Sequence, residues 1–132
     1  MYKIAVKHVK DYAFKVKSSG YEFAIDAKGK EGITPPDTLL AGLASCIGVY
    51  VTKYSEGAKL GLENFEIIAE GEFSTDAPVR FKEVSITIDL KGAKLEERRA
   101  NALMEFIKNC PVHNTLENKP EVKIRINDGD KG

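Results

Sequence analysis

The segment from Pro35 to about Glu56 constrains the fold of this chain more than any other part of the sequence. It is apolar nearly all round as far as Val51. Thr34 is the expected N-cap, with Pro35 as the first helical residue and the Asp37 carboxylate reaching back to the cap. A helix that is apolar all round is buried, whereas a surface helix shows a single apolar stripe. We therefore predict a central helix, with the rest of the chain packed around it.

The remaining segments alternate apolar and polar residues with a period of two, or carry an apolar stripe at helical spacing. Strands are predicted over residues 2–9, 12–17, 21–27, 64–74, 82–90 and 121–126, a second helix over residues 94–110, and a short further helix from Pro111. The resulting order is βββ-α-ββ-α-β. Strands without regular βα alternation are typical of an α+β fold rather than a doubly wound parallel sheet.

Length and charge exclude several classes of protein. The 132 residues predict a single domain over residues 1–132, with a disordered tail at residues 128–132. The 20 Lys and Arg residues balance the 20 Asp and Glu residues, which argues against binding to nucleic acid or to a membrane surface. The longest apolar stretch is shorter than the ~20 residues of a membrane span, and no secretion signal is evident. We expect a cytoplasmic protein.

The two cysteines, Cys46 and Cys110, are the candidate chemical groups. They lie far apart in the sequence, form no CxxC motif and are too few for a disulfide framework. Each can be a small buried apolar residue, or a nucleophilic thiolate. A metal site joining them to His113 and His8 can be written down, but no ligand pair has a recognised zinc spacing. We expect neither a metal nor a cofactor.

Both cysteines lie in segments that resemble motifs of the OsmC/Ohr superfamily. Residues 35–46 read PPDTLLAGLASC, which is similar to that family's helix motif: a proline, an acidic residue, two aliphatic residues, a run of small residues and a cysteine. Residues 110–112 read CPV, which resembles the second cysteine motif of the family. The two motifs and the predicted order of elements cover essentially the whole chain.

The resemblance implies an OsmC-like fold in an intertwined homodimer, with strands wrapped around two central helices and active sites at the subunit interface. It also implies an antioxidant, peroxiredoxin-like reductase of organic hydroperoxides. Cys46 would attack the peroxide O–O bond, its sulfenic acid would condense with Cys110 to a disulfide, and an external dithiol would reduce that disulfide. The alternative is a non-catalytic protein of this fold that binds an apolar small molecule or senses the redox state.

A thiolate near a protein core needs a cation or hydrogen-bond donor to stabilise it. The resemblance implies an arginine from the N-terminal strands, held by a glutamate near the start of the cysteine helix. Here no arginine precedes Arg80, and Asp37 takes the acidic position. Three alternatives stay open. Lys28 or Lys30 could supply the charge without the forked geometry of arginine, Arg80 could reach Cys46 from its own or the partner subunit, or no cation is present.

Asp37 and His113 each have a structural interpretation beside the functional one. On an ideal helix Asp37 lies on the opposite side from Cys46, so we expect it to cap the helix, with an indirect role through a bridging cation as the alternative. His113 follows Cys110 closely. It could assist Cys110 as a base, although we favour a role in capping a turn.

Overall fold

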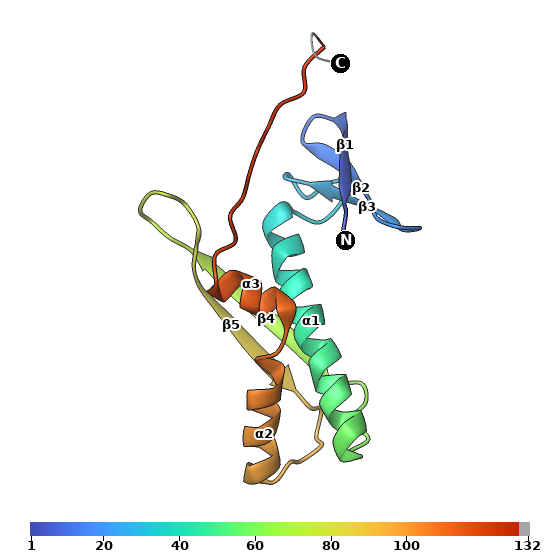
Figure 1. The fold of residues 1–132 in the computed structure, drawn as a ribbon, viewed down its shortest axis with the longest axis vertical. Helices are drawn as coiled ribbons and strands as arrows, with labels where there is room; N and C mark the ends of the chain where they lie inside the picture. The colour runs from blue at the N-terminus through green and yellow to red at the C-terminus, as the bar shows by residue number, and fades with distance from the viewer. Residues whose placement is uncertain (130–132) are drawn as a thin grey trace.

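The structure, a computed structural model, describes residues 1–129 and has the predicted α+β fold. A three-stranded sheet precedes a long helix, and a two-stranded hairpin and two shorter helices follow it (Figure 1). Of the tail that we expected to be disordered, residues 130–132 lie outside the described part. The elements are β1 (Ala5–Lys10), β2 (Ala13–Lys17), β3 (Glu22–Asp26), α1 (Pro35–Ala58), β4 (Glu66–Phe73), β5 (Phe81–Asp89), α2 (Glu97–Ile107) and α3 (Pro111–Glu117).

Helix α1 begins where its capping residues predict. The Thr34 hydroxyl accepts a hydrogen bond from the backbone N–H of Asp37 at 3.2 Å. The Asp37 carboxylate does not return this bond to Thr34 in the part of the chain that the structure describes. The helix continues to Ala58 and ends at Lys59, which adopts the left-handed conformation with φ 56°. It is therefore slightly longer than predicted.

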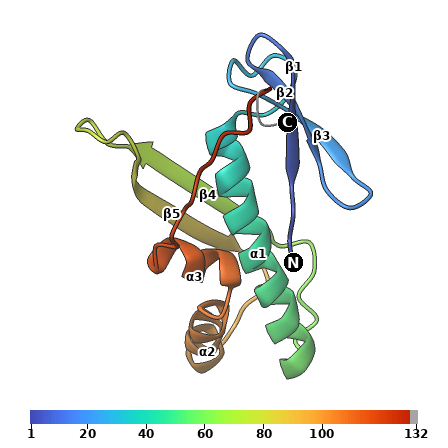
Figure 2. The same cartoon turned by 45° about the horizontal axis from the view of Figure 1, so that its top comes forward.

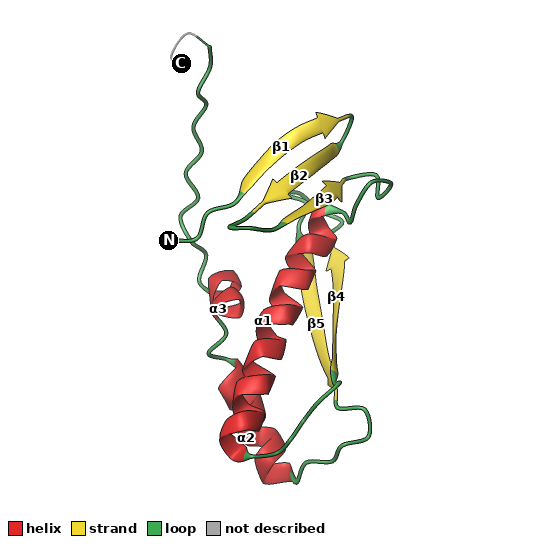
Figure 3. Cartoon of the chain, turned by 90° about the vertical axis from the view of Figure 1, so that its right-hand side faces the viewer, coloured by secondary structure: helices red, strands yellow, loops and turns green. Residues whose placement is uncertain are grey.

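Other secondary-structure elements pack against helix α1 on two of its sides. The β4–β5 hairpin packs on one side, and α2 and α3 pack on another (Figure 3). The alternation of β5 turns Val84, Ile86 and Ile88 toward the helix, as a period of two requires. The core thus lies between α1, the hairpin and the two shorter helices. Its buried cluster consists of Leu43, Ile47 and Val51 from α1, Leu103 from α2, and Cys110.

A third side of α1 is uncovered, contrary to the prediction that the helix is buried all round. Ala41, Gly42, Ser45 and Val49 are exposed, and Val49 keeps 50% of its surface accessible. The reason is that the elements of one chain cover only part of the helix circumference. None of the helices within residues 1–129 is long and apolar enough to cross a membrane.

The three-stranded sheet, with antiparallel order β1-β2-β3, sits at the N-terminal end of α1 (Figures 1 and 2). Asp26, at the end of β3, fixes the loop that leads to α1. Its carboxylate accepts backbone N–H bonds from Lys28 at 2.9 Å and Glu31 at 3.0 Å. Gly32 passes so close to the backbone of Ala24 that a Cβ atom would overlap the carbonyl. This loop sets where the sheet stands relative to the helix.

The strand predicted over residues 121–126 is absent, which is a correction to the predicted order of elements. Val122, Ile124 and Ile126 alternate as expected, but the segment is exposed and bonded to no strand of residues 1–129. Ile124 keeps 88% of its surface accessible. The segment runs from α3 toward the end of the molecule that carries the three-stranded sheet (Figures 1 and 2). A strand needs a neighbour to take up its backbone hydrogen bonds, and one chain provides none there.

Candidate active site

The structure brings the two cysteines together. Cys46 lies on α1 and is half-buried against the core cluster, and Cys110 lies just before α3, which packs directly on α1. Cys46 packs against the cluster that contains Cys110, close enough to influence the Cys110 thiol, and Cys110 is fully buried, with 0% of its surface accessible. Two thiols that lie close together can form a disulfide when their Cα atoms come within about 7 Å.

Cys110 is held by its position at the start of α3. It is the N-cap of that helix, and its Sγ accepts a hydrogen bond from the backbone N–H of His113 at 3.4 Å. Pro111 is tolerated in the first helical turn because its missing N–H would have no helical partner there. The short helix predicted from Pro111 is therefore present as α3, whereas α2 (Glu97–Ile107) is shorter than the helix predicted over residues 94–110. Cys110 itself is the capping group that we had expected His113 to be.

Burial raises the pKa of the Cys110 thiol above its usual value, because the thiolate would lose its hydration. The hydrogen bond to Cys46 raises the pKa further, whereas the backbone N–H groups of His113 and Val112 act in the opposite direction. The net shift is upward. Cys110 therefore stays protonated near neutral pH.

The His113 ring is held on α3 by a neighbouring glutamate. Its Nε2 is 3.4 Å from a carboxylate oxygen of Glu117, one helical turn further along α3. Its Nδ1 is buried and has no hydrogen-bond partner among residues 1–129. The ring makes no hydrogen bond to Cys110 in the described chain, so the contact of His113 with this thiol is through its backbone N–H.

The charged groups considered near the helix start stay apart from Cys46. Lys28 extends over the ring of Tyr12, with its Nζ 4.8 Å from the ring centroid, and Lys30 is exposed in the loop before α1. Asp37 is exposed on the first turn of α1. Within the described residues, Asp37 forms no ion pair, and neither lysine makes a hydrogen bond to Cys46.

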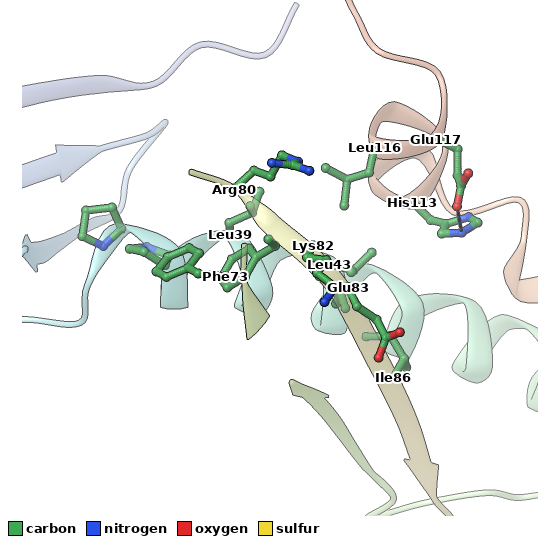
Figure 4. Close-up of a pocket in the computed structure, with 14 residues that line it drawn as sticks. Leu39, Leu43, Phe73, Arg80, Lys82, Glu83, Ile86, His113, Leu116 and Glu117 are labelled. Carbon is green, nitrogen blue, oxygen red and sulfur yellow. Dashed lines mark ion pairs between the residues drawn. The ribbon is translucent and has the colours of Figure 1, made fainter. Parts of the chain in front are cut away.

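Sequence reasoning missed a hollow near this part of the core. It has a volume of about 880 Å³ and is lined by the N-terminal half of α1, the β4–β5 hairpin and α3 (Figure 4), and neither cysteine is among its lining residues. A second hollow of about 320 Å³ shares Ile86 and His113 with it. Leu43, three residues before Cys46, lines the main hollow. The apolar faces of α1 and β5 were readable in the sequence, but the space between them depends on how the elements pack.

Arg80 lines the main hollow from the loop between β4 and β5. Its guanidinium extends toward Leu116 of α3 (Figure 4). The hydrogen bonds that Arg80 makes within residues 1–129 go to its own loop and none goes to Cys46. The structure thus separates Arg80, which faces the hollow, from the cysteine pair in the core.

The chain matches the model of the OsmC-like protein family over residues 27–125, which is most of its length. The chain belongs to the OsmC-like family. The matched region contains both cysteines, α1, the hairpin and α3. This confirms the resemblance seen in the two cysteine motifs.

Two curated relatives and one solved structure match nearly the whole chain. The hydroperoxide reductase of Mycoplasma genitalium is 28% identical over 88% of this chain and 86% of its own length. The hydroperoxide reductase of Mycoplasma pneumoniae is 24% identical over 96% of this chain and 94% of its own length. The crystal structure of an OsmC-like protein from Mycoplasma pneumoniae matches with a TM-score of 0.75 at 22% identity, covering 90% of this chain and 89% of that one. The fold of this OsmC-like chain is therefore that of solved relatives.

The residues of this OsmC-like site suit thiol chemistry better than metal chemistry. Histidine, cysteine, aspartate and glutamate side chains do not gather in groups of three or more that could hold a metal ion anywhere in residues 1–129. The site consists instead of two thiols that lie close together, one of them deeply buried, and each is three residues from a residue that lines the main hollow, Leu43 or His113. Such an arrangement can pass between dithiol and disulfide forms.

Proposed function

We propose that this protein is a thiol-dependent reductase of organic hydroperoxides. The observation that carries the proposal is that Cys46 and Cys110, which come from distant parts of the sequence, lie close together in the folded chain. The curated relatives named hydroperoxide reductases support a peroxidase-type role. In this proposal Cys46 is the peroxidatic residue and Cys110 the resolving residue.

In the first step the Cys46 thiolate attacks the terminal oxygen of the hydroperoxide. A sulfur–oxygen bond forms, the O–O bond breaks, and the departing alkoxide takes up a proton to become an alcohol. The Cys46 sulfur is oxidised by two electrons to a sulfenic acid, and the peroxide is reduced by the same two electrons.

In the second step Cys110 attacks the sulfenic sulfur of Cys46. A disulfide forms, and the hydroxyl group leaves with the Cys110 proton as water. The raised pKa of Cys110 keeps that proton in place until the sulfenic acid is there to receive it. An external dithiol then restores both thiols by disulfide exchange, which supplies the two electrons of the cycle.

The same proposal includes a homodimer. The uncovered face of α1, the exposed strand β1 and the extended segment with Val122, Ile124 and Ile126 together leave much apolar surface uncovered. Soluble proteins rarely leave large apolar patches free unless they bind something. A second copy of the chain would cover the α1 face and give the extended segment a strand to pair with.

Light scattering coupled to size-exclusion chromatography tests the homodimer. The wild-type protein is expected at twice the chain mass. Val49→Glu puts a charge on the uncovered face of α1 and is expected to give a folded monomer, judged by circular dichroism. Lys94→Glu, in the loop before α2, is the matched control and leaves the dimer intact. A wild-type monomer at micromolar concentration contradicts this part of the proposal.

The second candidate function is binding of an apolar small molecule without catalysis, with the cysteines sensing the redox state. The hollow of about 880 Å³ favours it, because that volume is within the range of ligand pockets and its lining is mostly apolar. It differs from the first candidate in leaving the ligand chemically unchanged.

Consumption of cumene hydroperoxide with dithiothreitol as the reductant separates the two functions. The wild-type protein is expected to turn over, Cys46→Ser to fall to the rate without protein, and Cys110→Ser to lose the disulfide step. Lys94→Ala, at an exposed residue in the loop before α2, is the control and keeps full activity. If the wild-type protein and Cys46→Ser consume the hydroperoxide equally slowly, the reductase proposal is wrong.

A further inference from the structure

Cys46 and Cys110 differ in how far solvent reaches them. Cys46 lies on α1 and is half-buried, whereas Cys110 has 0% of its surface accessible. Cys110 belongs to the buried cluster that also contains residues of α1 and α2, and Val112 of α3 packs against the same cluster. A reagent from solvent therefore reaches the Cys110 sulfur only when the surrounding elements open.

The start of α3 holds the Cys110 sulfur in place. Its Sγ accepts a hydrogen bond from the backbone N–H of His113 at 3.4 Å, and Pro111 begins the helix directly after it. Burial is the main cause that raises the pKa of the Cys110 thiol, and the backbone N–H groups of His113 and Val112 act against it. A negative charge on this sulfur thus meets hydrogen-bond donors without leaving the core.

Burial and basicity have opposite effects on the reduction of a disulfide between the two cysteines. A thiolate that attacks a disulfide bonds to one sulfur and expels the other, and the less basic sulfur leaves faster. The raised pKa of Cys110 makes it the poorer leaving group, which favours attack on Cys110. The accessible surfaces favour attack on Cys46 instead, because an attacking thiolate must reach the sulfur to which it bonds.

Access outweighs basicity in this structure. The basicity of the leaving sulfur changes the rate of exchange gradually, because only part of the charge has developed on that sulfur in the transition state. A sulfur without accessible surface is attacked only in molecules whose core has opened, so the rate falls by the fraction of molecules that are open. Cys46 needs no such opening.

We infer that the external dithiol attacks the Cys46 sulfur of the oxidised protein and that Cys110 leaves as the thiolate. A bond forms between one sulfur of the dithiol and Cys46, the Cys46–Cys110 bond breaks, and its electron pair goes to Cys110, which then takes up a proton. The second thiol of the reductant closes a disulfide within the reductant and releases Cys46, so two electrons pass to the protein. The inference rests on the proposed function and makes Cys46 the residue that both substrates reach.

The test traps the mixed disulfide in the wild-type protein. The protein is first oxidised with diamide, which takes the two thiol hydrogen atoms and leaves the Cys46–Cys110 disulfide without any hydroperoxide. It is then treated with glutathione, a monothiol that cannot complete the reduction by itself, and is quenched at early times with N-ethylmaleimide in denaturant. Peptide mass spectrometry is expected to find glutathione on Cys46 and the maleimide on Cys110, in at least about tenfold excess over the reverse pattern.

The same oxidised protein unfolded in urea is the matched control. Both sulfurs are accessible there, so glutathione is expected on both cysteines, which shows that the assay detects either product. Glutathione mainly on Cys110 of the folded protein overturns the inference while the reductase function stands. Glutathione on Cys46 of a protein that consumes no cumene hydroperoxide supports the inference and contradicts the reductase function.

A second measurement isolates access from basicity. Cys110→Ser and Cys46→Ser each keep one thiol, and both are modified with methyl and with benzyl methanethiosulfonate, which share a leaving group but differ in size. The pKa of a thiol affects both reagents alike, whereas restricted access slows the benzyl reagent more. The ratio of methyl to benzyl rates is expected to be at least about tenfold larger for Cys110 than for Cys46. Equal ratios in the two folded variants, judged by circular dichroism, overturn the inference.

Discussion

The N-terminal sheet and the body that follows it are packed very differently. Every residue of β1 is exposed, whereas the β4–β5 hairpin lies against α1 and contributes to the core. The buried apolar cluster, the two thiols and the main hollow all belong to the body formed by α1, β4, β5, α2 and α3. The sheet is joined to this body chiefly through the loop fixed by Asp26.

This difference in packing indicates that the body holds the thiol site and that the sheet is free to take part in association. The body is dense enough to hold Cys46 and Cys110 in contact, and a fixed geometry is what a dithiol site needs. The N-terminal segment that carries the sheet leaves apolar side chains such as Ile4 and Val6 uncovered, which fits the proposed contact with a second copy of the chain. We therefore expect changes in the body to affect stability and chemistry, and changes in the sheet to affect association.

The largest effect is expected from two matched truncations. Ile47→Ala removes a buried side chain from the core and should lower the free energy of unfolding by about 2–5 kcal/mol. Ile4→Ala removes the same atoms from a residue that is 57% exposed and should cost the single chain no more than about 0.5 kcal/mol. Urea unfolding of dilute protein measures both. Equal losses would remove the distinction between the two regions.

A smaller change in the free energy of unfolding is expected at alkaline pH, from Cys110 in the body of the molecule. Because the pKa of Cys110 is raised in the folded chain, the unfolded chain loses this proton first as the pH rises above about 8.5. The stability that Cys110 contributes is therefore complete below that pH and is lost as the pH rises toward the folded pKa. Thermal unfolding at several pH values should show this decline in the wild-type protein and a flatter curve in Cys110→Ser. The same slope in both proteins argues against the buried thiol as its source.

The smallest change in the free energy of unfolding is expected at acid pH, from Asp26 in the loop that follows the N-terminal sheet. Backbone N–H bonds from Lys28 and Glu31 lower the pKa of the Asp26 carboxyl below its usual value. Its contribution to stability is therefore present above about pH 4 and is lost as the pH falls through the folded pKa. Asp26→Asn should be less stable at neutral pH and should lack this acid-side decline. The control Asp37→Asn, at an exposed carboxylate, should retain it.

Much of the fold could be predicted because the periodicities are local. Thr34, Pro35 and the apolar run place α1, and the alternation of Val84, Ile86 and Ile88 places β5. Local periodicity could not show whether residues 121–126 form a paired strand. Its alternation shows that the segment can be extended, but pairing depends on a neighbour that one chain does not bring to it.

The candidate site was only partly predictable for a similar reason. The sequence motifs indicated Cys46 and Cys110 separately, but their contact depends on how α3 packs on α1. The break at Pro111 was visible, yet not that it would make Cys110 a helix cap. Arg80 was noted for its position in the chain, and its place at the edge of a hollow follows from the tertiary packing of the hairpin.

The most direct test of the central claim is the mass of the protein after one equivalent of cumene hydroperoxide. The reduced wild-type protein is predicted to lose two hydrogen atoms and to yield a peptide pair joined by a Cys46–Cys110 disulfide. Cys110→Ser is predicted to stop at a sulfenic acid on Cys46, trapped by dimedone, and Cys46→Ser to remain unchanged. A wild-type protein that keeps both thiols after exposure to the hydroperoxide would contradict the account.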